Sequence, residues 1–285
     1  MKILLTGANG QLGRCFQDRL PTGWQLQATD SDTLDITDFE EVIRFVKECM
    51  PDAIVNAAAY TAVDKAESDI TITERVNITG PKNLAIAAKS INKKFIHVST
   101  DYVFDGNSEE PYIETDPTNP LSVYGVTKLK GEQAVLDNLE HAIIIRTAWV
   151  FSEYGKNFVK TMIRLANERN KLDIVNDQFG CPTYAGDLAE AIITLLKLQV
   201  TGIYHYCGNE AVSWCQFAET IFEKAFENHL ISHIPSITGI TTEQYPTPAK
   251  RPKYSILSCK KITDLGIKTS DWNEQLNRVI YKIVN

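Results

Sequence analysis

Apolar and polar positions follow two different periods along the first half of the chain. Short apolar runs bounded by turn residues predict strands at 2–6, 25–30, 53–60, 94–104 and 141–151. Stretches with apolar residues at helical spacing predict helices between them, at 11–20, 36–50, 71–92 and 122–138. Because strands that alternate with helices join through right-handed crossovers, the pattern indicates a parallel sheet with helices on both faces. The predicted fold class is therefore α/β, with a doubly wound parallel sheet.

The alternation loosens after about residue 151, where a smaller lobe is expected. The pattern there predicts helices at 157–169 and 187–198 and strands at 172–177 and 203–208. Two capping boxes mark helix starts, Thr37-x-x-Glu40 for the second helix and Ser213-x-x-Gln216 for a later one. Residues 232–258 are rich in Pro, Thr and Ser, which predicts mostly loop. The aromatic and basic side chains of this segment indicate a binding loop.

Composition and charge narrow the range of partners. The chain has 285 residues, of which 44% are hydrophobic and 23% charged, as in a globular protein with a full core. A net charge of −7 without a Lys/Arg-rich arm argues against a nucleic-acid or anionic-membrane partner. No run of about 18 apolar residues occurs, so no membrane span is expected.

The cysteines and the first residues indicate a compartment. Six cysteines are scattered without a C-x-x-C pair, which predicts reduced thiols and neither a zinc site nor a disulfide framework. The chain begins with a strand-like run and a glycine turn, and it lacks the apolar stretch of a signal peptide. We therefore expect a cytoplasmic protein.

A glycine-rich turn, TGANGQLG, follows the first predicted strand. Gly7, Gly10 and Gly13 lie three residues apart, where glycine allows a tight turn, close approach of a pyrophosphate and close helix–strand packing. The helix start at Gln11 and Leu12 offers backbone N–H groups and a positive dipole end to phosphates. Helix packing alone would also favour glycines here. Their position at the start of an alternating chain favours a Rossmann-like dinucleotide-binding domain.

Further cofactor contacts are expected where strands end. Asp30 ends the second predicted strand, where an acidic residue hydrogen-bonds the adenosine ribose, although a turn or cap aspartate is the alternative. An aspartate there favours NADH over NADPH, but Arg14 could offset its charge, so both cofactors stay open. The small side chains of Asn56–Tyr60 would suit either a ligand crevice or a packed core. The other cofactor-binding candidates are Asp35 and Ile36 beside the adenine, and Ala59, Tyr60, Thr61 and Val98 near strand ends.

A threonine, a tyrosine and a lysine form the candidate catalytic group. Thr100 and Asp101 follow the fourth predicted strand, and Tyr124 precedes Lys128 by four residues in a predicted helix. Four residues make about one helical turn, so both side chains leave the same face. We predict an acid–base couple in which the Lys128 ammonium lowers the pKa of Tyr124 while Thr100 donates to a substrate carbonyl oxygen. The alternatives are a surface pair and a threonine that bonds its own backbone.

The ordered set of these motifs resembles the extended short-chain dehydrogenase/reductase superfamily over essentially the whole chain. Within it the chain is similar to reductases of dTDP-linked 4-keto-6-deoxy sugars, most specifically in VNDQFGCPT and YPTPAKRPKYSIL. The resemblance implies an NADPH- or NADH-dependent reductase in which Tyr124 protonates the alkoxide at C4 and Thr100 holds the carbonyl oxygen. Lys128 would favour the phenolate left behind and bind the nicotinamide ribose. The substrate-binding residues that it implies are Thr100, Asp101, Trp149, Gln178, Thr183 and Arg251.

Two of these residues have clear alternatives. Trp149 would offer a face to the sugar ring, but it would equally suit a core tryptophan. Arg251 would clamp the nucleotide diphosphate, since guanidinium suits that bidentate contact, but it could be a surface arginine in a loop.

The chain departs from the family pattern at two positions. Nucleotide-sugar 4,6-dehydratases follow Thr-Asp with a glutamate, whereas Tyr102 stands here, so elimination lacks its base. The family is associated with a divalent ion helped by an acidic residue on the first helix, where this chain has Cys15. We therefore expect no protein metal site, and a homodimer stays open.

The resemblance also implies a division of the chain. Residues 1–151 would form the dinucleotide-binding domain, completed by parts of 185–210, and 152–184 and 211–285 mainly the substrate-binding lobe. Two other functions remain as alternatives: a reductase or epimerase of another nucleotide sugar, or a non-catalytic dinucleotide-binding regulatory subunit. The β subunit of methionine adenosyltransferase is similar to this family and is of the second kind. The intact set of Thr100, Tyr124 and Lys128 favours the enzyme.

Overall fold

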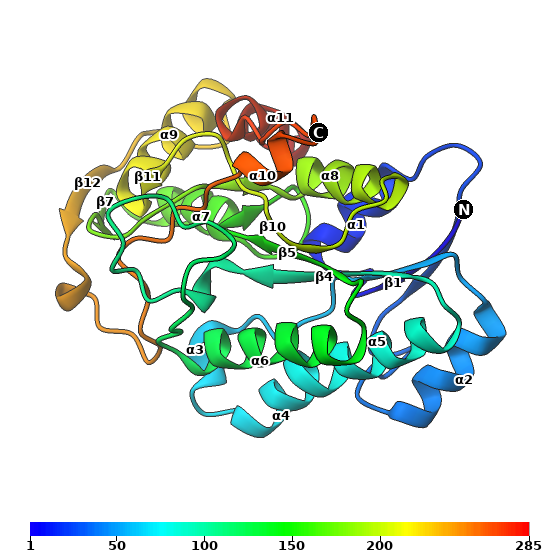
Figure 1. Cartoon of the computed structure of the whole chain (residues 1–285). Coiled ribbons are helices and arrows are strands. Elements are labelled where there is room, and N and C mark those ends of the chain that lie inside the picture. The colour runs from blue at the N-terminus through cyan, green and yellow to red at the C-terminus, as the bar shows by residue number, and fades with distance from the viewer. Residues whose placement is uncertain (285) are drawn as a thin grey trace.

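The computed structural model describes residues 1–284. A six-stranded sheet lies at the centre of this part of the chain (Figure 1). All six strands are parallel, in the order β10-β5-β4-β3-β1-β2. Their bounds are Lys2–Thr6 for β1, Gln25–Thr29 for β2, Ala53–Asn56 for β3, Lys94–Thr100 for β4, Ile143–Thr147 for β5 and Gly202–His205 for β10. The predicted parallel α/β sheet is confirmed.

Helices cover both faces of this sheet (Figure 1). Ile3 and Leu5 of β1 point to the face covered by α1 (Gln11–Asp18) and α8 (Ala185–Lys197). Leu4 points to the opposite face, which is covered by α2 (Phe39–Cys49), α5 (Gly80–Ser90) and α6 (Val123–Asn138). Strands buried on both faces read as continuous apolar runs, and this explains why they were visible in the sequence. None of the helices in the described part of the chain is long and apolar enough to cross a bilayer.

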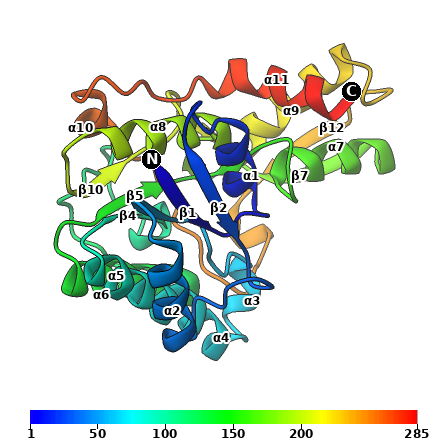
Figure 2. The same cartoon turned by 90° about the vertical axis from the view of Figure 1, so that its right-hand side faces the viewer.

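A second hydrophobic cluster builds a lobe beside the sheet (Figure 2). It is made by α7 (Phe158–Glu168), α9 (Trp214–Glu227) and α11 (Trp272–Val284), together with β7 (Lys171–Val175) and β12 (Ser236–Ile240), which pair in parallel. The shorter elements are β6 Val150–Phe151, β8 Phe179–Gly180, β9 Thr183–Tyr184, β11 Val212–Ser213, α3 Val63–Ala66, α10 Lys260–Thr263 and the 3-10 turns η2 Asp101–Val103 and η3 Thr242–Gln244. The division of the chain into two domains near residue 151 stays a prediction.

The helix predicted at 71–92 is divided in the structure. α4 (Ile70–Glu74) and α5 are joined by a π-helical segment, η1 (Arg75–Thr79). Buried Asn77 lies in this segment; its Oδ1 accepts from the Tyr60 N–H at 2.8 Å, and its Nδ2 donates to Thr127 at 3.2 Å. Single π turns occur at functional sites and leave no trace in the hydrophobic period.

One other local prediction is wrong, and two are confirmed. α2 is capped by Asp38, whose carboxylate accepts from the Glu41 N–H at 2.9 Å, so the Thr37-x-x-Glu40 box does not form. The segment 232–258 is mostly loop, as predicted, and it also contains the strand β12, which main-chain pairing with β7 stabilises. The box Ser213-x-x-Gln216 does cap α9.

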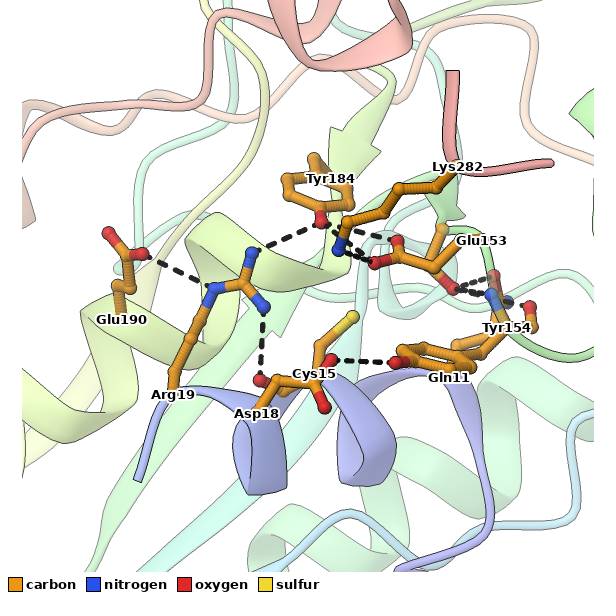
Figure 3. A network of polar contacts seen from close by, with 10 residues as sticks. Gln11, Cys15, Asp18, Arg19, Glu153, Tyr154, Tyr184, Glu190 and Lys282 are labelled. Carbon is orange, nitrogen blue, oxygen red and sulfur yellow. Dashed lines mark hydrogen bonds and ion pairs between the residues drawn. The ribbon is translucent and has the colours of Figure 1, made fainter. Parts of the chain in front are cut away.

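A polar network joins α1 to the lobe (Figure 3). Arg19, which follows α1, contacts Glu190 of α8 at 3.2 Å and the Tyr184 hydroxyl at 3.1 Å. Tyr184 donates to Glu153, and Lys282 of α11 pairs with the same carboxylate. These hydrogen bonds and ion pairs connect α11 to the end of α1.

Candidate active site

The carboxyl ends of β1, β3, β4 and β5 open into one cavity of about 820 Å³. Open parallel sheets bind their ligands at this edge. The sequence-predicted residues that line the cavity are Gly7, Gly10, Gln11, Leu12, Gly13, Asp30, Asp35, Ile36, Ala59, Thr61, Val98, Thr100, Asp101, Tyr124, Lys128 and Trp149. The structure therefore brings the nucleotide turn, Tyr124 and Lys128 to a single cavity.

The glycine turn forms a cradle that no larger residue could build. Gly7 has φ +73, and a Cβ on it would lie 2.6 Å from the Ala58 nitrogen. A Cβ on Gly13 would lie 2.3 Å from the Gly7 oxygen. Gly10 is the N-cap of α1 and supplies no side-chain cap, so the first helical N–H groups stay available to an anion. These features fit the pyrophosphate of a dinucleotide.

Asp30 is held firmly at the end of β2. One carboxylate oxygen accepts from the Asn9 N–H at 2.9 Å and the other from the Ser31 N–H at 2.8 Å. The side chain is thereby tied to the glycine turn, and it lines the cavity.

The start of α6 positions Tyr124. The Ser122 hydroxyl caps this helix by accepting from the Gly125 N–H at 3.2 Å. Gly125 lets the helix pack close to the previous strand's end, because a Cβ there would lie 2.3 Å from the Tyr102 oxygen. The Tyr102 ring meets the Tyr124 ring edge-on, with centroids 5.4 Å apart.

Burial controls the protonation of the groups around Tyr124. Desolvation raises the pKa of the Tyr124 phenol to about 12, against the opposing effect of a hydrogen bond with Thr100. This direction is opposite to the predicted lowering by Lys128, because helical spacing shows adjacency but not the loss of water. Desolvation likewise raises the pKa of Asp101 to about 6. The Thr100 hydroxyl donates to Asp101 Oδ1 at 3.0 Å.

Lys128 lies at the bottom of the cavity and is only 2% exposed. Its Nζ donates to the Val98 carbonyl oxygen at 2.7 Å. Burial lowers the pKa of Lys128 to about 8, although the nearby carboxylate of Glu132 acts in the opposite direction. Glu132 is itself engaged by Arg146, with Nη2–Oε2 at 2.7 Å.

Trp149 lines the cavity, and one face of its ring is covered by Trp214. The two rings stack with centroids 3.4 Å apart and planes 5° from parallel. Trp149 has a φ of 46°, and this left-handed residue separates β5 from β6, which were predicted as one strand. Trp214 is the first residue of α9 and also lines the cavity.

Four predicted residues lie outside the cavity wall. The Tyr60 hydroxyl donates to Asp69, Gln178 Nε2 donates to Thr242, and Thr183 Oγ1 donates to the Cys181 carbonyl oxygen. Arg251 forms a two-pronged ion pair with Asp64 of α3, at 2.8 and 3.1 Å. The side chains of all four are therefore engaged by protein groups in this structure.

Several lining residues were not predicted. The cavity also has in its wall Ser31, Thr37, Val63, Val76, Gly155, Lys156, Asn157 and Trp214. Asn157 caps α7 and donates to the Gln11 side chain at 2.9 Å, which joins the lobe to the glycine turn. Among these residues, only Trp214 had a signal in the sequence: the capping box Ser213-x-x-Gln216 places it at the start of a helix.

A parallel sheet of this order, a glycine cradle after β1 and a Tyr-x-x-x-Lys pair at the cavity define an NAD(P)H-dependent oxidoreductase of the short-chain dehydrogenase/reductase type. The model of the family described as RmlD substrate binding domain matches residues 1–285, and the chain belongs to this family.

Known relatives agree in sequence and in structure. The dTDP-4-dehydrorhamnose reductase of Aggregatibacter actinomycetemcomitans is 44% identical over 287 residues, with 98% of each chain covered. The solved structure of a dTDP-4-dehydrorhamnose reductase from Clostridium acetobutylicum ATCC 824 matches all of both chains, with a TM-score of 0.95 and 42% identity. That of Bacillus anthracis str. Ames, in complex with NADP, has a TM-score of 0.93 and 37% identity over 99% of both chains. The resemblance and the fold class inferred from the sequence are confirmed.

Proposed function

We propose that the protein reduces the C4 keto group of dTDP-4-dehydro-L-rhamnose to give dTDP-L-rhamnose, with NADPH or NADH as the reductant. The observation that carries the proposal is the meeting of the glycine cradle, Thr100, Tyr124 and Lys128 in one cavity. The names of the relatives supply the substrate class.

The cradle at Gly7, Gly10 and Gly13 holds the pyrophosphate, and Asp30 accepts from the adenosine ribose. Asp35, Ile36, Ala59, Thr61 and Val98 line the path between adenine and nicotinamide. When bound, the reduced nicotinamide supplies the hydride. Both cofactors stay within the proposal, since Asp30 favours NADH while the Bacillus anthracis structure contains NADP.

Tyr124 gives its proton to the alkoxide that develops at C4. Its raised pKa keeps the phenol protonated at neutral pH, so the acid form is ready before the reaction begins. The ammonium of Lys128 favours the phenolate left behind and contacts the nicotinamide ribose. Thr100 donates a hydrogen bond to the substrate carbonyl oxygen once its hydroxyl rotates away from Asp101.

The sugar nucleotide occupies the side of the cavity near Trp149 and Asp101. The ring of Trp149 offers the sugar a face when Trp214 moves aside. Arg251 clamps the diphosphate with a guanidinium that Asp64 already holds in a fixed orientation. Gln178 and Thr183 stay predictions for the pocket.

A spectrophotometric assay of NADPH and NADH oxidation tests the reaction. The dTDP-4-keto sugar should be turned over, and UDP-linked keto sugars should be much poorer substrates. Preference for another nucleotide sugar would favour the second enzyme function, and zero turnover with a co-purifying transferase would favour the regulatory subunit. We place the reaction in the cytoplasm; a homodimer stays a prediction that light scattering can test.

A further inference from the structure

A chain of buried polar groups runs beneath Lys128. The Thr6 hydroxyl donates to Asn56 Oδ1 at 2.7 Å, and Asn56 Nδ2 lies 3.0 Å from His97 Nδ1. His97 Nε2 lies 3.5 Å from Lys128 Nζ. Asn56 and His97 are 0% exposed, so water does not compete for these contacts. The reaction as derived above uses neither residue.

The orientation of the Asn56 amide follows from its neighbours. The Ala58 backbone N–H, which can only donate, lies 3.0 Å from Asn56 Oδ1, and the Thr6 hydroxyl lies on the same oxygen. The NH₂ group of Asn56 must therefore face His97. An N–H donor at this place requires an acceptor in return, so His97 Nδ1 carries no proton.

His97 is neutral, and its one proton is consequently on Nε2. Full burial, together with the positive charge of Lys128, lowers the pKa of His97 well below its ordinary value. A neutral imidazole has one N–H and one bare nitrogen, and the bare nitrogen is Nδ1. The Nε2–H bond therefore points toward Lys128 Nζ.

We propose that Asn56 and His97 are positioning residues that set the charge of Lys128 by presenting it with a hydrogen-bond donor. An ammonium has three N–H groups and no acceptor, so an N–H aimed at it is unfavourable. A neutral amine accepts from His97 Nε2–H with its lone pair and still donates to the Val98 carbonyl oxygen. The pair thus favours release of a proton from Lys128.

Other charged groups near Lys128 do not supply this effect. The other titratable and charged groups are Tyr124 and Glu132 of α6, Arg146 of β5 and Asp101 of η2. Glu132 favours the ammonium, but Arg146 and the Ser99 hydroxyl share its charge. The facing segments η1 and β3 contribute the uncharged Asn77 and Asn56. Because the charge of Arg146 is paired with Glu132, the imidazole N–H is the remaining group, besides burial, that disfavours the ammonium.

The consequence concerns how Tyr124 regains its proton. This part rests on the proposed function. After Tyr124 has protonated the product, the phenolate needs a proton, and a lysine with a lowered pKa releases its own proton more readily than one with an ordinary pKa. The imidazole N–H then stabilises the neutral amine until a proton returns from solvent.

Nuclear magnetic resonance of the ligand-free protein tests the first step. Correlations between the imidazole carbon-bound hydrogens and nitrogens of ¹⁵N-labelled protein distinguish the two tautomers. The signals of His97, one of five histidines, are assigned by their loss in His97→Gln. If that variant does not fold, single glutamine variants of the other four give the assignment by elimination. The proton is expected on Nε2 at neutral pH; a proton on Nδ1, or on both nitrogens, overturns the inference whatever the enzyme's substrate.

The pH dependence of kcat/KM tests the effect on Lys128. Glutamine at position 97 can turn an amide oxygen toward the ammonium, so the alkaline limb of His97→Gln should move up by ~1 pH unit. The matched control is His205→Gln, a buried histidine outside the cavity wall whose Nδ1 donates to the Tyr112 carbonyl oxygen, and the alkaline limb of this variant should not move. A limb in His97→Gln that coincides with the wild type, or that moves equally in both variants, overturns the inference.

Discussion

Replacing Asp101 with asparagine is expected to stabilise the protein at neutral pH. Asp101 is 2% exposed, and burial raises the pKa of its carboxyl from 3.8 to about 6. Between these two values the folded protein binds this proton more tightly than the unfolded chain does. The free energy of unfolding contributed by Asp101 is therefore full at low pH and falls as the pH rises through this window.

The size of the effect follows from the shift. About 2 pKa units at about 1.36 kcal/mol per unit correspond to about 3 kcal/mol of destabilisation at pH 7. Asparagine carries no charge, and its carbonyl oxygen can still accept from Thr100, which lies 3.0 Å from Asp101 Oδ1. Asp101→Asn should raise the free energy of unfolding by up to this amount at pH 7, with the gain vanishing near about pH 4.

Urea unfolding followed by tryptophan fluorescence, at several pH values between these limits, measures the difference. Asp173→Asn, at an exposed position on β7, is the matched control and should change stability little at any pH. A variant no more stable than the wild type at pH 7, or a gain that stays constant with pH, would refute the reasoning about desolvation.

Three further substitutions test other parts of the account. Gly13→Ala should abolish dinucleotide binding in a titration and lower stability by roughly 1–3 kcal/mol, because its Cβ would lie 2.3 Å from the Gly7 oxygen. Glu132→Gln should lower the free energy of unfolding by about 3–5 kcal/mol, because it leaves the charge of Arg146 buried and unpaired. Arg251→Lys should raise KM for the sugar nucleotide about tenfold without changing cofactor affinity, because an ammonium cannot make the two-pronged phosphate contact.

Matched variants separate these effects from general damage. A Cβ on Gly10 would lie 3.3 Å from the Gly7 oxygen, so Gly10→Ala should be more stable than Gly13→Ala. Glu168→Gln breaks an exposed pair with Arg164 and should cost under about 1 kcal/mol. Equal losses within either pair would contradict the packing and burial arguments, and an unchanged KM in Arg251→Lys would remove Arg251 from the substrate site.

Local sequence patterns predicted the parts of the site that are local in the chain. The glycine turn was visible because three glycines must follow one strand closely, and Tyr124 and Lys128 because one helical turn joins them. The strands and helices of the sheet were visible in the hydrophobic pattern. A strand buried on both faces gives a continuous apolar run, and a helix buried on one face gives apolar residues at helical spacing.

Tertiary packing decided the rest. Trp214 and Asn157 reach the cavity from the lobe, and no spacing along the chain connects them with Gly7. Arg251 is paired with Asp64, which lies 187 positions away in the sequence. A local motif could therefore suggest a binding arginine, but it could not show that this arginine is already paired. The direction of the Tyr124 pKa shift was missed because burial is a property of the folded protein.

In the proposed reaction, the Tyr124 phenol supplies the proton to the oxygen at C4. The most direct test compares Tyr124→Phe with the wild type in cofactor binding and in turnover of the dTDP-4-keto sugar. Tyr124→Phe should bind the cofactor with unchanged affinity and turn over the sugar about 10²-fold or more slowly, as expected when a general acid is lost. Turnover close to that of the wild type would contradict the assignment of Tyr124 and the mechanism built on it.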